Sequence, residues 1–163
     1  NRHPRVNILS PGCGVGGHCI AVDPWFIVHA GGYEARLIKS AREVNDHKAD
    51  WCIEKIKNAA LKFELQNGRK PKVACMGLAF KPDIDDLRES PALNITRRLI
   101  ADGVDVIAVE PNIKAHKDFE IVDYKKAIEI SDIIVFLVGH KEFKGLKIEK
   151  EVLDFCGVRN TNI

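Results

Sequence analysis

A short glycine-rich segment that ends in a cysteine carries the most reactive grouping of side chains in the sequence. It runs Gly14-Val15-Gly16-Gly17-His18-Cys19, and Asp23 follows closely. Closely spaced glycines let a ligand approach the backbone, and their N–H groups can hold an oxyanion. A cysteine just before a helix has its thiolate stabilised by the free N–H groups and the field of that helix. We therefore predict that Cys19 is a nucleophile, with His18 and Asp23 placed to hold a proton or orient a water.

Three other interpretations of this segment stay open at the level of sequence. It could be a tight glycine-rich turn with a buried cysteine. Cys13 and Cys19 could form a redox pair, although Cys13 is better explained as a structural thiol. A metal could bind Cys13, His18, Cys19 and Asp23, but their spacing matches no pair of C-x-x-C knuckles. We therefore predict no metal site.

A second segment, from Gly77 to Pro91, combines an aromatic ring with charges where a predicted strand passes into a helix. In open α/β sheets that point forms a ligand-binding crevice, and a helix N-terminus there favours phosphate. Phe80 could stack on a base or a sugar, and Lys81 and Arg88 could meet negative charge. The segment from Gly77 is not a G-x-G-x-x-G dinucleotide fingerprint, and a solvated charged loop is the plain alternative. The remaining histidines have no comparable neighbours in sequence, and we expect them on the surface or in packing contacts: His3, His29, His47, His116 and His140.

The elements that must position these residues begin with a shaped loop and a short helix. Residues 1–24 are dense in glycine, proline and other turn formers. An apolar helix is expected over 24–30, with Asp23 as its N-cap and a proline at its first position. The following pair of glycines ends it.

A longer amphipathic helix is predicted over 34–65 from apolar residues at helical spacing. We expect a break near 45–46 and an end at Gln66-Asn67-Gly68. Its apolar stripe is hard to bury beside a small sheet, so we expect this helix to pack against its counterpart in a homodimer.

The rest of the chain alternates between strands and helices. This rhythm predicts a small parallel sheet of the Rossmann-like kind. The fold class is therefore α/β, with a helical connector over residues 1–68 and a parallel-sheet domain over 69–163. The expected strands cover 73–77, 104–109, 132–138 and 152–155, and the expected helices cover 124–130 and 90–102, the latter with Ser90 as its N-cap.

Composition narrows the class of protein further. The 163 residues are 45% hydrophobic and 29% charged, which is too apolar for a disordered chain. A net charge of +2 argues against a dedicated nucleic-acid binder, and no apolar run is long enough to predict a membrane span. The absence of a signal-peptide pattern points to the cytoplasm. The five irregularly spaced cysteines do not form a disulfide framework, and in a cytoplasmic chain they are expected to be free thiols. The only methionine is Met76, so we expect a processed chain or a piece of a longer one.

Both segments resemble one family. The string PGCGVGGHCIAVDPWF from Pro11 resembles the catalytic loop of UDP-sugar dehydrogenases, the UDP-glucose/GDP-mannose dehydrogenase family. The string GLAFKPDIDDLRESPA from Gly77 resembles the opening of the family's UDP-binding domain. The version around Cys19 is most similar to the branch that acts on UDP-N-acetyl-D-mannosamine, with UDP-glucose as the alternative substrate.

What the resemblance implies is an NAD-dependent, four-electron oxidation of a UDP-sugar. A first NAD oxidises the sugar's 6-hydroxyl to an aldehyde, which Cys19 captures as a thiohemiacetal. A second NAD takes hydride to leave a thioester, and water hydrolyses the thioester to a uronate. A thiolate is suited to both the capture and the departure.

The resemblance also implies roles for single residues. Asp23 is the second catalytic residue and helps to position water. The family's N-terminal NAD domain is missing, so we expect this chain to be inactive alone and its parent to be the enzyme. A stand-alone UDP-sugar-binding or dimerisation module is the alternative. Substrate binding is assigned to Arg2, Gly16, Gly17, His18, Phe80 and Lys81, and NAD binding to Arg88.

Overall fold

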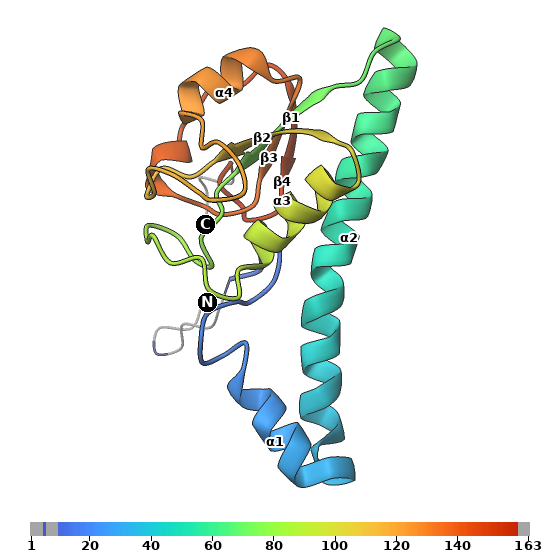
Figure 1. Cartoon of the computed structure of the whole chain (residues 1–163), viewed down its shortest axis with the longest axis vertical. Coiled ribbons are helices and arrows are strands. Elements are labelled where there is room, and N and C mark those ends of the chain that lie inside the picture. The colour runs from blue at the N-terminus through green and yellow to red at the C-terminus, as the bar shows by residue number, and fades with distance from the viewer. Residues whose placement is uncertain (1–4, 6–9, 160–163) are drawn as a thin grey trace.

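A long helix stands beside a small sheet that carries two shorter helices (Figure 1). The structure is a computed structural model, and it describes Arg5 and residues 10–159. Helix α1 lies at the end of α2 that extends beyond the sheet (Figure 1). The elements in chain order are α1 (Asp23–Gly31), a 3-10 helix η1 (Gly32–Ala35), α2 (Arg36–Asn67), β1 (Lys72–Met76), α3 (Pro91–Ala101), β2 (Asp105–Val109), α4 (Tyr124–Ile130), β3 (Ile133–Phe136), a 3-10 helix η2 (Lys141–Phe143) and β4 (Glu151–Asp154).

The four strands are parallel and lie in the order β2-β1-β3-β4, which confirms the predicted α/β class. Met76 at the end of β1 pairs with Val109 on one side and Phe136 on the other. The segments that follow β1, β2 and β3 therefore leave the sheet at the same edge. Ligands bind at this edge in open parallel sheets.

Apolar side chains cover both faces of the sheet, so the strands read as nearly continuous hydrophobic runs. Val73 and Cys75 of β1 belong to the cluster that includes α2 and α3 side chains. Ala74 and Met76 belong to the cluster on the opposite face, with Ala127 of α4. This burial on two sides holds the strand ends, and hence the loops after them, in fixed positions.

Helix α2 is continuous over 32 residues, so the predicted break near 45–46 is wrong. The Asn45 side chain points to the glycine-rich segment, where its Oδ1 accepts from Val15 N at 2.8 Å. It therefore does not compete for backbone groups inside the helix. Arg42 and Asp46 also pair one turn apart, at 3.0 Å. The expected end is confirmed, since Gly68 caps the helix in a left-handed conformation.

The two predicted N-caps have different outcomes. Ser90 caps α3, because its Oγ accepts from Leu93 N at 3.2 Å. Asp23 does not cap α1: Val22 holds the cap position without a side-chain bond, and Asp23 is the first helical residue. No helix among the described residues has both the length and the apolarity to cross a bilayer.

Candidate functional site

The two segments singled out by their chemistry pack directly against each other. Gly16 and Gly17 are buried, and Gly17 N donates to Arg88 O at 3.2 Å. A Cβ built on Gly16 would lie 2.3 Å from Glu89 O, and one on Gly17 would lie 3.0 Å from the Phe80 ring. The sequence predicted that these glycines let a ligand approach the backbone. In the structure, the segment from Gly77 to Pro91 occupies this close position.

Cys19 is exposed, in a turn just before α1. Its carbonyl oxygen accepts from Val22 N at 3.0 Å and from Asp23 N at 2.8 Å. These two amides serve the backbone of Cys19 rather than its sulfur. They also fix Asp23, whose side chain is exposed, in the turn that follows the thiol.

Arg88 and Asp86 form an ion pair at the mouth of this site. Arg88 Nη2 lies 2.6 Å from Asp86 Oδ2, and its Nε lies 3.0 Å from both carboxylate oxygens. The bonds from Arg88 lower the pKa of Asp86 to about 2, with a smaller electrostatic contribution from His18. The pair raises the pKa of Arg88, to which Cys19 also contributes. The structure thus brings His18 and Cys19 near Arg88 and adds Asp86, neither of which was predicted from the sequence.

Phe80 and Lys81 are neighbours on the same loop and differ in burial. Phe80 is half-buried against Gly17, and its N–H donates to Asp86 O at 3.1 Å. Lys81 is exposed. Arg2, the remaining residue assigned to substrate binding, lies outside the described residues.

A cavity of about 510 Å³ lies beside the cysteine loop. Val15 and Trp25 line it from the N-terminal side, Arg42 and Asn45 from α2, and Leu87 from the second loop. Asn45 holds Val15 at both its N–H (2.8 Å) and its carbonyl (3.4 Å). Helix α2 therefore holds the glycine-rich segment in place through Asn45.

Cys13 is buried under this segment, and its Sγ donates to Leu137 O at 3.4 Å. Burial raises the pKa of its thiol to about 12. A neutral, buried thiol is a poor partner for thiol exchange. The structure therefore favours the structural role for Cys13 over the redox pair with Cys19.

A buried pair of Glu110 and His140 supports the second loop from inside, and sequence reasoning missed it. His140 is fully buried, and its Nε2 lies 3.0 Å from Glu110 Oε2. The same oxygen accepts from Leu78 N at 2.8 Å and Ala79 N at 3.0 Å. Burial alone would raise the pKa of Glu110, but the bonds from His140 and from backbone amides hold it below the usual value.

His140 was expected on the surface or in packing contacts; it is buried, and its buried partner Glu110 was not foreseen. The tertiary fold creates this pair, because Glu110 follows β2 and His140 follows β3 at one sheet edge. A carboxylate directly after a buried apolar strand was the signal in the sequence that pointed to it.

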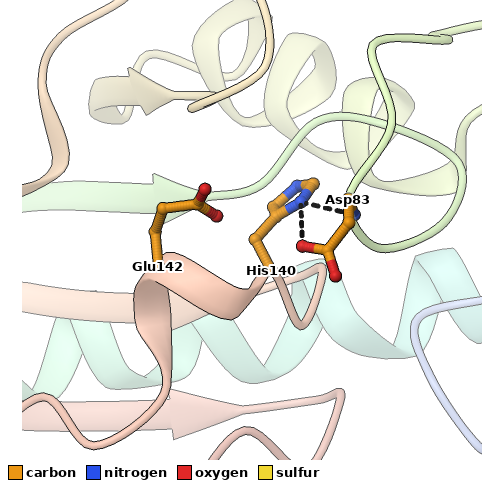
Figure 2. Close-up of side chains that lie close together, drawn as sticks. All are labelled: Asp83, His140 and Glu142. Atoms are coloured by element: carbon orange, nitrogen blue, oxygen red, sulfur yellow. Dashed lines mark hydrogen bonds and ion pairs between the residues drawn. The ribbon is translucent and has the colours of Figure 1, made fainter.

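Asp83, His140 and Glu142 place their ligand atoms within 4.8 Å of one another, as a metal site would require (Figure 2). His140 Nδ1 already accepts from Asp83 N at 3.0 Å, and Nε2 is bonded to Glu110. Both ring nitrogens are thus engaged in holding the loop. We assign this group to hydrogen bonding and not to a metal.

Comparison with known proteins agrees with the two strings. The model of the UDP-glucose/GDP-mannose dehydrogenase family's UDP binding domain matches residues 74–157. The model of the same family's central domain matches residues 1–47. Both segments of the site, the cysteine loop and the loop after β1, fall within these matches.

Curated proteins of similar sequence are also named as sugar-nucleotide dehydrogenases. The chain is 51% identical, over 96% of its length, to a Campylobacter jejuni protein named UDP-N-acetyl-D-mannosamine dehydrogenase. It is 49% identical, over 92% of its length, to a Ralstonia nicotianae protein named NDP-N-acetyl-D-galactosaminuronic acid dehydrogenase. The chain spans 39% of the first relative's length and 36% of the second's.

Solved structures show the same fold. A UDP-D-ManNAc dehydrogenase from Pyrococcus horikoshii superimposes with a TM-score of 0.77 at 29% identity, over 96% of this chain and 38% of that one. A UDP-N-acetyl-mannosamine dehydrogenase from Staphylococcus aureus gives 0.74 at 31% identity, over 97% and 42%. The resemblance drawn from the two strings is confirmed, and the chain belongs to the UDP-glucose/GDP-mannose dehydrogenase family.

Proposed function

We propose that this chain supplies the catalytic thiol and the nucleotide-binding part of an NAD-dependent UDP-sugar 6-dehydrogenase. The proposed substrate is UDP-N-acetyl-D-mannosamine, with UDP-glucose as the alternative. The observation that carries the proposal is the packing of the cysteine loop on the loop after β1. Gly17, two residues before the exposed thiol, lies against the Phe80 ring and donates to Arg88 O, and Cys19 is close enough to Arg88 for their charges to interact.

Cys19 acts as the nucleophile in this proposal. Its sulfur attacks the C6 aldehyde of the sugar and forms a thiohemiacetal. Loss of a hydride from C6 leaves a thioester, and water then attacks that carbon, releases the thiol and gives the uronate. From alcohol to uronate the sugar loses four electrons and gains one oxygen from water. A thiolate serves because it is both a strong nucleophile and a good leaving group.

Asp23 positions the attacking water and accepts its proton. The hydrogen bond from Asp23 N to Cys19 O, at 2.8 Å, supports this role, because it holds the two residues in one turn. The exposed Asp23 carboxylate can reach solvent, the source of that water.

Phe80 and Lys81 bind the nucleotide-sugar, with Gly16, Gly17 and His18 on the facing loop. Lys81 offers an exposed ammonium group suited to phosphate oxygens. The half-buried Phe80 ring presents an apolar edge for a sugar or base. Arg2 completes the assigned set.

Among the residues of the site, Arg88 is the one that we assign to NAD binding. Bound NAD would supply the hydride acceptor. Arg88 is exposed at the site mouth and close enough to Cys19 for their charges to interact. A guanidinium group is suited to the pyrophosphate of a dinucleotide. Its pairing with Asp86 holds it in place for that contact.

Residues 1–68 and 69–163 form the two functional parts in this proposal. The first carries the thiol and the helical connector, and the second binds UDP. The matches cover the family's central and UDP binding domains, so we expect the 163 residues to bind UDP without oxidising a sugar. Five free thiols support a cytoplasmic site of action.

A homodimer is the assembly that we propose. Figure 1 shows that one end of α2 extends beyond the sheet. Large apolar side chains at this end are exposed. Leu37 and Val44 lie seven residues apart, on one stripe of the helix, and are 80% and 71% exposed. Phe26 of α1 and Tyr33 of η1 are exposed at the same end.

The test of the function is a chimera in which residues 1–163 replace the matching part of the Campylobacter jejuni relative. We expect it to form two NADH per uronate from UDP-N-acetyl-D-mannosamine, measured by absorbance and mass spectrometry. The variant Cys19→Ser should form no uronate. Undiminished uronate formation by that variant would overturn the mechanism.

A binding measurement separates the enzyme from a module without turnover. Calorimetric titration of UDP, UDP-glucose and UDP-N-acetyl-D-mannosamine into the 163-residue chain gives the nucleotide and sugar preference. Binding of UDP with no uronate from the chimera would support the stand-alone module instead.

A further inference from the structure

The loop segment Phe80-Lys81-Pro82, called the arch below, is held at both of its ends by one buried pair of side chains; Phe80 is half-buried, and Lys81 and Pro82 are exposed. On the N-terminal side, Glu110 Oε2 accepts from Leu78 N at 2.8 Å and Ala79 N at 3.0 Å. On the C-terminal side, His140 Nδ1 accepts from Asp83 N at 3.0 Å. The two residues proposed to bind nucleotide thus lie between two fixed points.

Glu110 and His140 are joined to each other, and this fixes the hydrogen on the ring. Both side chains are fully buried, and His140 Nε2 lies 3.0 Å from Glu110 Oε2. Because a carboxylate accepts, Nε2 carries the hydrogen, and Nδ1 is left to accept from Asp83 N at 3.0 Å and from Asn112 Nδ2 at 3.1 Å. Asn112 adds bonds to Glu110 Oε1 from its N–H and its amide, at 3.0 and 3.2 Å.

Asp83 needs this support because its backbone is in the left-handed region, with φ at 61°. A non-glycine residue adopts that conformation only when its surroundings hold it there. His140 binds its N–H, and its own Oδ1 accepts from Lys141 N at 2.9 Å. Figure 2 shows the His140 ring directed at Asp83 on the loop.

We propose that Glu110 and His140 are positioning residues that set Phe80 and Lys81 for the phosphates of the nucleotide. This inference rests on the proposed function of the loop. Neither side chain touches solvent, so both act through the backbone of the arch. The chain of bonds runs from Ala79 through Glu110 and His140 to Asp83.

Two substitutions at His140 test the two ring nitrogens separately, because each keeps the hydrogen-bonding group of one nitrogen and removes that of the other. His140→Asn places a carbonyl oxygen near the Nδ1 position and keeps the acceptor for Asp83 N. His140→Gln places an amide near the Nε2 position and keeps the donor to Glu110. His140→Asn loses the bond to Glu110, and His140→Gln loses the Nδ1 acceptor of Asp83 N and Asn112 Nδ2. We therefore expect both variants to unfold at a lower temperature than the unchanged chain, measured by circular dichroism.

Affinity for UDP should separate the two variants. Isothermal titration of UDP into the 163-residue chain should show about tenfold weaker binding for His140→Gln, because Asp83 N loses its buried acceptor. His140→Asn should bind within about threefold of the unchanged chain, as expected of a conservative rescue. A purely structural role would lower both stabilities and leave the two affinities equal.

Two further variants complete the test. Lys81→Ala should weaken UDP binding, and His116→Gln should not, although the His116 side chain is only 8% exposed and its Nδ1 accepts from Asp118 N at 3.2 Å. If Lys81→Ala weakens binding and the two His140 variants bind alike, the positioning role is wrong and the loop's function stands. If the unchanged chain does not bind UDP, or Lys81→Ala binds as well as it does, the proposed nucleotide site and the positioning role both fail.

Discussion

At the scale of single residues, two glycines decide whether the site exists. Gly16 and Gly17 let the cysteine loop lie against the loop after β1 with backbone almost in contact. The chemistry of each loop was evident from its residue types. Their contact was not, because it joins positions about sixty to seventy residues apart in the chain.

Gly16→Ala is therefore expected to force the loops apart. Its Cβ would lie 2.3 Å from Glu89 O and 2.8 Å from Pro91 Cδ. Overpacking of this kind costs about 1–3 kcal/mol of the free energy of unfolding, measurable by urea denaturation. Gly12→Ala is the matched control, because nothing lies within 4 Å of its Cβ. Equal stability of both variants would contradict the packing described.

The Asp86–Arg88 pair predicts a dependence on pH. The folded-state pKa of Asp86, about 2, lies below its ordinary value of 3.8. The pair therefore stabilises the folded chain above about pH 4, and that contribution is lost as the pH falls through about 2. Arg88→Gln should return the pKa of Asp86 toward 3.8. Carboxyl NMR titration measures this, and Arg97→Gln, which removes the Asp118 pair, should leave Asp86 unchanged.

At the scale of elements, local signals located most helices and strands correctly. Ser90 before a proline marked the start of α3, and α4 begins and ends at the predicted residues. Local reasoning failed at 45–46, where a polar pair suggested a break in α2. Asn45 binds the backbone of Val15 thirty residues away, so its amide belongs to tertiary structure and leaves the helix intact.

Asn45→Ala should release the cysteine loop from α2. It removes the bonds to Val15 N and Val15 O, worth about 1 kcal/mol each. We expect faster hydrogen exchange at the Val15 amide with helix α2 intact. Asn58→Ala, an exposed asparagine on the same helix, is the control. Unchanged protection of Val15 would show that α2 does not hold the loop.

At the scale of the whole molecule, the sheet is shorter than helix α2, so apolar side chains at the end of α2 beyond the sheet stay exposed. Leu37 and Val44 are exposed on one stripe of α2, which supports the proposed homodimer.

Leu37→Glu should shift the chain toward the monomer. A charge placed in an apolar interface has to be desolvated, so association should weaken by at least about tenfold. Sedimentation at micromolar concentration measures the change. Leu65→Glu is the matched control, because Leu65 is 78% exposed near the other end of the same helix. A monomer at micromolar concentration in the unchanged chain would contradict the dimer.

Sequence by itself determined the parallel α/β class, most element boundaries and the family, and it led to the prediction that Cys19 is the nucleophile. These follow from local periodicity, caps and strings of neighbouring residues. Only the tertiary structure decided that the two loops touch and that Glu110 and His140 share a buried bond. The physical reason is that a parallel sheet brings the ends of β1, β2 and β3 to one edge. Residues thirty or more positions apart in the chain meet at that edge, and their spacing in the sequence does not predict the contact.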